Sequence, residues 1–446
     1  MIVMKFGGSS VADASRIRHV TDIVQTQLDR KPVLLLSAMG DTTDHLLEAG
    51  SLAIKDGKTE ITHIEKLHLA TMKNLNIPKE EIKSLLDELI RLLSGISLIK
   101  ELSPMTKDYL VSFGERLSVR IVAAYLKSIG INAKAFDAWE MGFLSNSNYT
   151  QGELLKESWD LIPAKVLPQI KGNVLPVITG FLAKDDKGNI TTLGRGGSDL
   201  SATMIAAACK AEEVQIWKDV DGILSADPRI VKNAKPVQNV TYDEAAELAY
   251  FGAQVLHPRA MRPCMKTGTP VLIKNSYNIE APGTIIKQTL TTKTSELKDL
   301  PVRAITSKHN VILVDIVSTR MLGQYGFLEE VFSVFAKHHI SIDMVATSEV
   351  SVSLTLDETY DLGEVRNNLK KIASVEVKTG KAIISIIGDV KRSSEILART
   401  FKVCQQIGIN VQMVSQGASK VNIGFIVNDD EAAEAVKALH LDFFEE

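Results

Sequence analysis

Two glycine-rich segments of this sequence carry charged side chains suited to binding an anion. The first, Lys5-Phe-Gly-Gly-Ser-Ser10, follows a predicted strand and precedes a predicted helix over 11–27. Paired glycines let backbone N–H groups approach a phosphate, and the N-terminus of the following helix favours negative charge. Lys5 stands at the strand end, where its ammonium group could reach the same anion. An ordinary tight turn is the alternative, and the spacing of a Walker A loop is absent.

The second segment, Thr-Leu-Gly-Arg-Gly-Gly-Ser-Asp over 192–199, opens an alanine-rich predicted helix over 200–211. Three glycines around Arg195 predict another anion site, in which the guanidinium can hold a carboxylate through two hydrogen bonds. Ser198 or Asp199 is also expected to cap the helix, and capping alone is the alternative explanation. Capping requires neither Arg195 nor three glycines, so we favour a binding role.

A third segment, 217–229, begins where the predicted strand 214–217 ends. Ligands of open α/β sheets collect at the carboxyl ends of strands. Lys218, Asp219 and Arg229 suit the ribose and phosphates of a nucleotide, with a simple turn as the alternative. An Asp-x-Asp-Gly sequence within this segment is similar to the start of a calcium loop, but the later ligands are missing, which excludes Ca²⁺.

Two more segments offer polar side chains to the same site. Residues 37–43 follow the predicted strand 33–36 and provide hydroxyl groups, and Phe113-Gly-Glu115-Arg116 is expected to open a helix. An alternative role for Glu115 is to complement the dipole of that helix. Two phosphate-type loops, a guanidinium and a free carboxylate together indicate a nucleotide and a small zwitterion as ligands.

An alternation of short apolar runs and longer helical patterns must position these loops. Such alternation predicts an α/β fold with a largely parallel sheet whose strands are buried on both faces. The predicted strands lie at 33–36, 173–178, 214–217 and 270–273, and predicted helices at 16–27, 80–93 and 115–126.

Composition narrows the class of protein. The 446 residues suggest about three domains, and the 45% hydrophobic and 24% charged residues are ordinary for a globular protein. The net charge is −3 and the sequence contains no block of basic residues, so no nucleic-acid partner is expected. Cys209, Cys264 and Cys404 lack zinc spacing and point to a reducing compartment. No apolar run is long enough for a membrane span and no signal peptide is evident, so we expect a cytoplasmic protein without membrane partners.

The last third of the chain contains a weak internal repeat. A catalytic domain over 1–290 is expected to end in a polar linker over 291–301. Ile340-Ser-Ile-Asp-Met-Val then recurs 69 residues later as Ile409-Asn-Val-Gln-Met-Val. The pattern around each copy predicts a ferredoxin-like unit.

We expect the first unit over 308–382. The second should combine 302–307 with 383–446, the short strand 302–306 pairing into it. Because units of this kind pair edge to edge, a dimer is expected.

With these segments identified, the chain resembles the aspartate kinases of the amino-acid kinase family over essentially its whole length. The resemblance implies an open αβα sandwich followed by two ACT domains. It also implies transfer of the γ-phosphoryl group of ATP, with Mg²⁺, to the β-carboxylate of L-aspartate. The product would be 4-phospho-L-aspartate, the first intermediate of lysine, threonine and methionine biosynthesis. The matching motifs are KFGGSS at 5–10, SAMGDTTD at 37–44, SFGER at 112–116, TLGRGGSD at 192–199, DVDGILSADPR at 219–229 and FGAQVLHP at 251–258.

The resemblance assigns roles to individual residues. Lys5 would neutralise the transferring phosphoryl group, and Asp199 would orient Lys5 and the magnesium environment. Glu115 would bind the ammonium group of aspartate and Arg195 its α-carboxylate. Aspartate would also contact Thr43 and Ser198. The nucleotide contacts would be Lys5, Gly7, Gly8, Ser9, Ser37, Lys218, Asp219, Leu224, Arg229 and Gln254. Many members have Lys in place of Gln254 and Tyr in place of Leu224, so these two contacts differ in charge and in hydroxyl content.

The repeat itself indicates where an effector binds. Aligning the copies places Asp343 against Gln412 and Glu349 against Ala418, so only the first copy keeps two carboxylates. A basic effector would prefer the first copy, and the helix start at 325–328 could bind its α-carboxylate. The alternative is that both carboxylates are simply solvated strand residues.

Segments 321–328 and 341–349 look like the effector segments of lysine-inhibited aspartate kinases. We therefore expect feedback inhibition by L-lysine at a site between the first ACT domains of two subunits of a homodimer, which could pair into a dimer of dimers. Threonine is the competing effector. A non-catalytic amino-acid sensor and a kinase acting on glutamate are the competing functions. The expected effector contacts are Met321, Gln324, Gly326, Phe327, Leu328, Ser341, Asp343, Thr347, Ser348 and Glu349.

Overall fold

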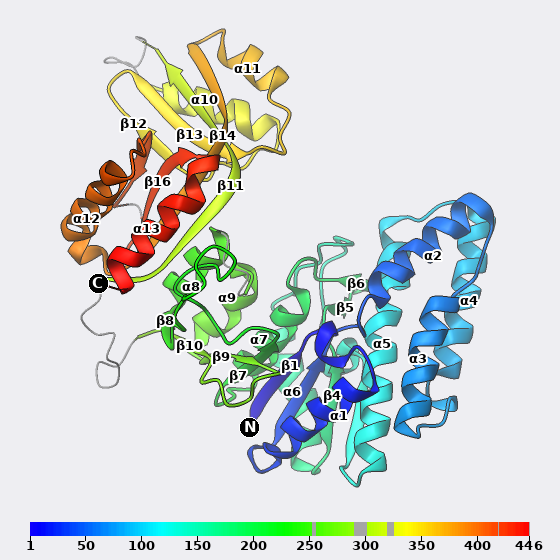
Figure 1. Cartoon of the computed structure of the whole chain (residues 1–446). Coiled ribbons are helices and arrows are strands. Elements are labelled where there is room, and N and C mark those ends of the chain that lie inside the picture. The colour runs from blue at the N-terminus through cyan, green and yellow to red at the C-terminus, as the bar shows by residue number, and fades with distance from the viewer. Residues whose placement is uncertain (252–255, 290–300, 319–324, 418, 446) are drawn as a thin grey trace. The chain divides into compact units, whose positions relative to one another are not determined.

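The computed structural model describes residues 1–251, 256–289, 301–318, 325–417 and 419–445. The chain forms two compact units (Figure 1). The first consists of 1–223, 238–242 and 255–290, and the second of 224–237, 243–254 and 291–446. Two short segments that precede the expected linker thus pack with the C-terminal unit.

An eight-stranded sheet forms the centre of the first unit, in the order β3-β4-β2-β1-β7-β9-β10-β8. Strands β3 to β9 in this order run parallel, and β10 runs antiparallel to β9. The mixed but largely parallel sheet confirms the predicted α/β class. The strands are β1 (Ile2–Phe6), β2 (Pro32–Leu36), β3 (Ala133–Phe136), β4 (Leu175–Thr179), β7 (Val214–Lys218), β8 (Asn239–Thr241), β9 (Val271–Asn275) and β10 (Thr284–Lys287).

Helices cover both faces of this sheet. Alternate residues of β1 share a core with α1 (Ala14–Gln25) and α5 (Pro104–Ser128). Helix α7 (Gly197–Ala208) packs on β1 and β2 and also contacts α6 (Ser158–Lys171) and α9 (Pro258–Thr267). Three helices, α2 (Thr42–Asp56), α3 (Thr62–Leu75) and α4 (Glu80–Ile99), pack beside α5 as an all-helical insertion (Figure 1). A two-stranded hairpin joins β5 (Leu182–Lys184) to β6 (Ile190–Thr192).

Two predicted helix starts are wrong. Helix α5 begins at Pro104 behind the capping hydroxyl of Ser103, so Glu115 lies in the middle of the helix. Gly114 lies inside this helix, and its lack of a side chain allows close packing, because a Cβ built on it would lie 2.7 Å from the Cβ of Ala38. Helix α7 begins at Gly197 and is not capped by a side chain, so neither Ser198 nor Asp199 serves as its N-cap.

The second unit is built on a six-stranded antiparallel sheet in the order β12-β13-β11-β14-β16-β15. Its longest strands, β11 and β14, run through both repeats, and each repeat buries its own apolar core. The predicted pairing of 302–306 with the second repeat is confirmed, because Val302 lies opposite Gly388 and Ile305 opposite Ile386. The strands are β11 (Val302–Val317), β12 (Val345–Thr347), β13 (Ser351–Asp357), β14 (Ser374–Gly388), β15 (Met413–Ser415) and β16 (Asn422–Asn428). The helices are α8 (Tyr242–Tyr250), α10 (Phe327–Lys337), α11 (Gly363–Leu369), α12 (Ser393–Gln406) and α13 (Ala432–Phe444).

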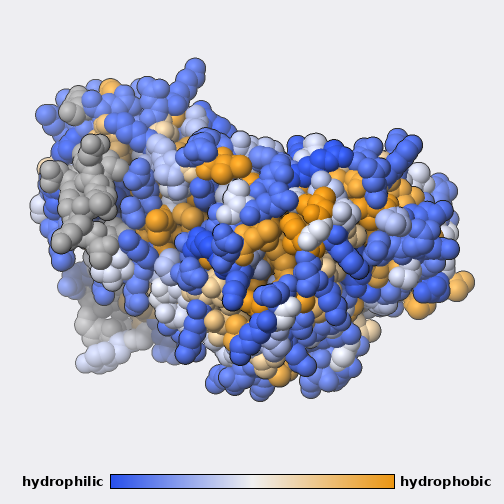
Figure 2. All heavy atoms as spheres, turned by 90° about the horizontal axis from the view of Figure 1, so that it is seen from below, coloured by the Kyte–Doolittle hydropathy of each residue, from blue (hydrophilic) through white to orange (hydrophobic). Residues whose placement is uncertain are grey.

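The surface of the molecule carries both hydrophilic and hydrophobic residues. Hydrophilic residues occupy much of the face drawn in Figure 2, with hydrophobic areas between them. Among the described helices, none has the length and apolar character needed to cross a bilayer.

Candidate active site

A cavity of about 280 Å³ lies at the carboxyl ends of the central strands of the first unit. Lys5 is the second-last residue of β1, Ser37 directly follows β2, and Phe181 lies two residues after β4. Parallel strands bring their carboxyl ends to one edge of a sheet, which explains why these distant segments meet. The residues around the cavity are Lys5, Ser37, Thr43, Glu115, Phe181, Gly194, Gly196, Gly197, Ser198 and Asp199.

A buried ion pair forms one wall of the cavity. Lys5 Nζ lies 2.7 Å from Asp199 Oδ1, and the two side chains are 9% and 10% exposed. Burial alone would raise the pKa of Asp199, but the attraction of Lys5 and Lys218 brings it below the usual value. Burial lowers the pKa of Lys218, and Asp199 partly opposes that shift. The ammonium group of Lys5 in the wall of the cavity suits the phosphates of a nucleotide.

The glycine pair after β1 gives the loop its close packing. A Cβ on Gly8 would lie 2.6 Å from the carbonyl oxygen of Ala38, so only glycine fits there. The backbone N–H of Gly40 donates to Gly8 O at 3.1 Å, which ties this loop to the one after β2. Gly7 stands beside the ammonium of Lys5, because a Cβ built on it would lie 3.8 Å from Nζ.

Glu115, another residue of the cavity wall, has a carboxyl group that is only partly satisfied by hydrogen bonds. Its Oε1 accepts a 3.3 Å hydrogen bond from the N–H of Ala38, whereas Oε2 is buried and has no hydrogen-bond partner. Burial raises the pKa of Glu115 to about 8. A buried acceptor without a hydrogen-bond partner costs free energy. A ligand that donates a hydrogen bond, such as an ammonium group, would therefore be favoured here.

The loop before α7 completes the site. Gly194 and Gly196 have φ angles of +69° and +71°, which glycine adopts readily, and they flank Arg195. The side chain of Arg195 is exposed, beside the cavity rather than in its wall. Ser198 lies in the wall, and its hydroxyl accepts from Ser37 Oγ at 3.2 Å.

The remaining expected nucleotide contacts are not all brought to this cavity. Lys218 ends β7 in the first unit, and Asp219 follows it on the surface. Leu224 and Arg229 belong to the second unit, where the guanidinium of Arg229 pairs with Asp227 at 2.6 Å. Ser9 is exposed in the loop after β1. Gln254 lies outside the described residues.

Phe181 is a cavity residue that the sequence analysis missed. It has a φ angle of +67°, which is uncommon for a side chain of this size and often marks a functional site. Its N–H donates to Ser201 Oγ at 3.1 Å. The signal was available, because Phe181 follows a predicted strand whose carboxyl end faces the other binding loops.

The expected effector residues lie on the first repeat of the second unit. Gly326 is the N-cap of α10, with Phe327 buried and Leu328 40% exposed behind it. Ser341, Thr347 and Glu349 are exposed, and the hydroxyls of Ser348 and Ser351 are 2.6 Å apart. Met321 and Gln324 lie outside the described residues.

Asp343 is not a solvated strand residue, so that alternative is wrong for this position. Its side chain is 1% exposed, and each oxygen has an internal partner. The hydroxyl of Tyr250 donates to Oδ1 at 2.6 Å, and Lys308 Nζ lies 2.7 Å from Oδ2. Lys308 also contacts Asp357 at 2.9 Å. An ammonium group of the chain itself thus occupies the carboxylate expected to bind an effector.

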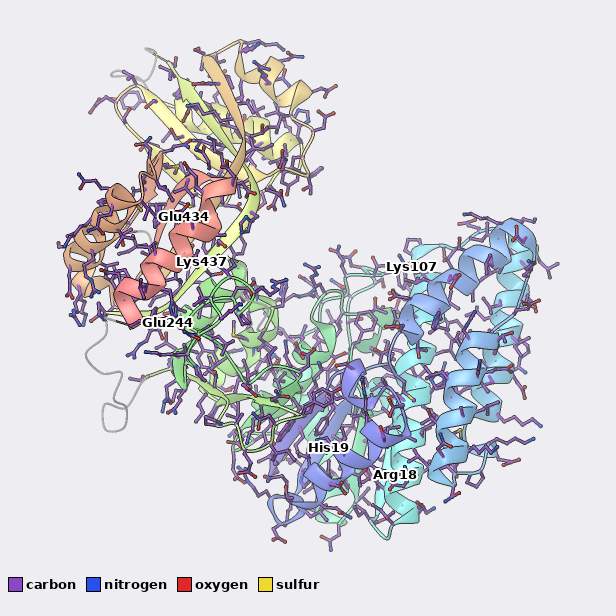
Figure 3. The ribbon with its side chains drawn as sticks, viewed as in Figure 1. Arg18, His19, Lys107, Glu244, Glu434 and Lys437 are labelled. Carbon is purple, nitrogen blue, oxygen red and sulfur yellow. The ribbon has the colours of Figure 1, made fainter. Side chains whose placement is uncertain are left out.

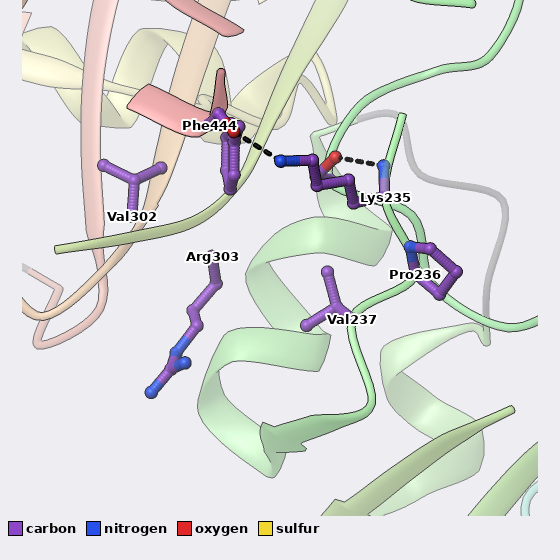
Figure 4. A pocket seen from close by; sticks show the side chains of 7 residues that line it. Lys235, Pro236, Val237, Val302, Arg303 and Phe444 are labelled. Atoms are coloured by element: carbon purple, nitrogen blue, oxygen red, sulfur yellow. Dashed lines mark hydrogen bonds between the residues drawn. The ribbon is translucent and has the colours of Figure 1, made fainter. Parts of the chain in front are cut away.

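Another cavity of about 200 Å³ lies in the first unit at the amino ends of β2, β3 and β4, where Lys31, Asn132 and Asn173 are among its lining residues. None of the expected site residues lines it. A cavity in the second unit beside Lys235 and Phe444 (Figure 4) measures about 10 Å³, room for no more than a water molecule. Across the described ranges, no three His, Cys, Asp or Glu side chains gather as metal ligands would.

Comparison with known proteins gives one consistent answer. The amino acid kinase family matches residues 1–275, and the ACT domain matches 314–369 and 384–443. Aspartokinase 1 of Arabidopsis thaliana is 51% identical over 99% of this chain and 80% of its own length. The structure is similar to that of Escherichia coli aspartokinase III bound to aspartate and ADP, with a TM-score of 0.82, 33% identity and full coverage of both chains. The same E. coli enzyme with lysine and aspartate has a TM-score of 0.80 and 33% identity, covering 100% of this chain and 99% of that one.

Together with the cavity, these matches show that the chain belongs to the amino acid kinase family and, within it, to the aspartokinases.

Proposed function

We propose that this protein transfers the γ-phosphoryl group of ATP to the β-carboxylate of L-aspartate, giving 4-phospho-L-aspartate. The observation that carries this proposal is one cavity holding both a buried cation, Lys5, and an unsatisfied buried carboxyl group, Glu115. The cation suits a phosphoryl group, and the carboxyl group suits the ammonium of an amino acid.

The reaction needs positioning and charge neutralisation rather than a nucleophilic side chain. The β-carboxylate of the substrate attacks the γ-phosphorus as the bond to the leaving ADP oxygen breaks, and Lys5 offsets the charge on the phosphoryl oxygens. Asp199 holds the ammonium of Lys5 at 2.7 Å. Glu115 and Arg195 would bind the ammonium and α-carboxylate of aspartate, and Thr43 and Ser198 would bind it through their hydroxyls.

A magnesium ion that arrives with the nucleotide fits the donor set of this cavity. Mg²⁺ is usually held by one or two carboxylates together with substrate phosphates, and Asp199 offers such a carboxylate. When bound, the ion would neutralise phosphate charge. Lys218 and Asp219 would contact the nucleotide from the end of β7.

Regulation by L-lysine is the second part of the proposal. The E. coli relative has been crystallised with lysine, and the first repeat of this chain keeps Asp343 and Glu349. An effector ammonium could reach Asp343 only by displacing Lys308, whereas Glu349 is exposed. The site would lie between the first ACT domains of a homodimer. A cytoplasmic location stays a prediction, and the Arabidopsis relative is named as chloroplastic.

Trapping the acyl phosphate tests the activity. With ATP and hydroxylamine present, the protein should convert L-aspartate, and not L-glutamate, to the hydroxamate. Lysine should reduce this rate and threonine alone should not. No hydroxamate from aspartate would favour a non-catalytic amino-acid sensor, and inhibition by threonine alone would replace lysine as the effector.

A further inference from the structure

The base of the loop that carries Arg195 is held by groups from outside the loop. The carbonyl of Thr192 accepts from Gly152 N at 2.7 Å, and the N–H of Leu193 donates to Phe181 O at 2.8 Å. The other two backbone groups of Thr192 and Leu193 are bound by charged side chains. The N–H and C=O groups of both Thr192 and Leu193, the two residues before Gly194, are therefore all hydrogen-bonded.

Asp108 is the first of these charged side chains. It lies on α5, is 1% exposed, and accepts the N–H of Thr192 at 2.9 Å and its hydroxyl at 2.8 Å. It also accepts the N–H of Thr150 at 2.8 Å. Lys107, labelled in Figure 3, is its neighbour in sequence and marks the part of α5 that packs against β6. A buried carboxylate with three donors in place is a rigid anchor, since hydrogen bonds to charged groups are the stronger ones.

Arg259 is the second. It lies at the start of α9, and its guanidinium donates to the carbonyl of Leu193 at 3.0 Å and to that of Gly152 at 2.6 Å. A planar guanidinium can bind two carbonyls at once, whereas the single ammonium of a lysine cannot match that geometry. Arg259 thus ties the loop to α9, and Asp108 ties it to α5.

We propose that Asp108 and Arg259 are positioning residues that fix the distance between Arg195 and Glu115 and so set the affinity for the amino acid substrate. This inference rests on the proposed function, in which Glu115 and Arg195 bind the two backbone groups of aspartate. Asp108 and Glu115 stand seven residues apart on α5, about two helical turns and on one face. One helix therefore carries the first group and anchors the loop that carries the second.

The glycines explain why the loop requires these anchors. Gly194 and Gly196 have positive φ angles and many accessible conformations, so the loop has little intrinsic preference for one geometry. Arg195 is exposed and stands between them. External hydrogen bonds at the base of the loop must therefore restrict the positions that its guanidinium samples.

Arg259→Ala is the test, with Arg262→Ala as the matched control because Arg262 is an exposed residue on the same helix. We expect Arg259→Ala to raise the KM for aspartate roughly tenfold to a hundredfold, the range for losing hydrogen bonds to a charged group. The KM for ATP should change less than about twofold, and Arg262→Ala should resemble the parent. Arg259→Lys should recover part of the affinity. Asp108→Asn, which keeps one acceptor oxygen, should also raise the KM for aspartate.

Amide hydrogen exchange of residues 193–197 without substrate separates this inference from the proposed function. Exchange should accelerate in Arg259→Ala and not in Arg262→Ala, whether or not the protein phosphorylates aspartate. Equal exchange and equal KM values in the two variants would overturn the inference. A parallel loss of affinity for ATP and aspartate would overturn it too, since that result indicates general damage to the fold.

Discussion

The buried carboxyl group of Glu115 makes aspartate binding dependent on pH. Burial raises the pKa of Glu115 to about 8 in the empty site, so at pH 7 about one molecule in eleven carries the ionised form. The substrate ammonium would bind the ionised form. Aspartate binding at pH 7 should therefore release a proton, at a free-energy cost of about 1.4 kcal/mol for one pH unit below the pKa.

The sign of the effect follows from this linkage. As pH rises toward the pKa of the empty site, the ionised fraction grows and the KM for aspartate falls, at most tenfold per pH unit. Above the pKa the KM should level off. We expect a fall of roughly 25-fold between pH 6.5 and pH 8.5 at saturating ATP, a range over which the amino group of aspartate stays largely protonated.

Initial rates at varied aspartate, measured across this range, test the prediction. Glu115→Gln cannot ionise, so its KM should be higher and independent of pH, which makes it the control. Calorimetry at pH 7 in buffers of different ionisation enthalpy should show close to one proton released as aspartate binds. A flat KM profile for the parent, or no released proton, would refute the assignment of Glu115 to the substrate ammonium.

Three other predictions follow from the geometry. Asp343→Ala should leave uninhibited turnover within about twofold of the parent and abolish inhibition by lysine; an unchanged inhibition curve would remove Asp343 from the effector site. Lys308→Met removes the internal ammonium 2.7 Å from Asp343, so the lysine concentration for half-inhibition should fall several-fold. Lys378→Met, which breaks an exposed ion pair of the same sheet, is the control, and a rise in that concentration for Lys308→Met would contradict the competition. Gly8→Ala places a Cβ 2.6 Å from the carbonyl oxygen of Ala38, so kcat should fall at least tenfold, and a normal rate would show that the loop tolerates displacement.

Local patterns in the sequence predict the binding loops well. The glycine pairs at 7–8 and 196–197 stand where a strand or hairpin gives way to a helix. Gly196 and Gly197 line the cavity, and the pair at 7–8 follows Lys5, which also lines it. The predicted strands 33–36 and 214–217 differ from β2 and β7 by one residue each, because short apolar runs bounded by polar residues have few other solutions. The glycines and strand ends that form these loops are specified by residues close together in the sequence, so a local pattern is enough to predict them.

Features that depend on tertiary packing escaped the sequence analysis. Gly114, beside Glu115 in α5, packs against Ala38, which is 76 residues away in the sequence, and no local pattern predicts such a contact. The pairing of Lys308 in β11 with Asp343, in the loop before β12, likewise joins residues that are distant in the sequence. A charged residue in a sequence is equally consistent with a binding site and with an internal ion pair until its partner is known.

The role of Lys5 is the most direct test of how this site works. Lys5→Ala should lower kcat for aspartyl phosphate formation at least about 10²-fold to 10³-fold, the scale for losing a preorganised stabiliser of transition-state charge. Lys5→Arg keeps the charge and checks that a fall in rate is not caused by leaving Asp199 unpaired, and the melting temperature of each variant reports folding. A folded Lys5→Ala protein that transfers phosphate at a near-normal rate would contradict the central claim.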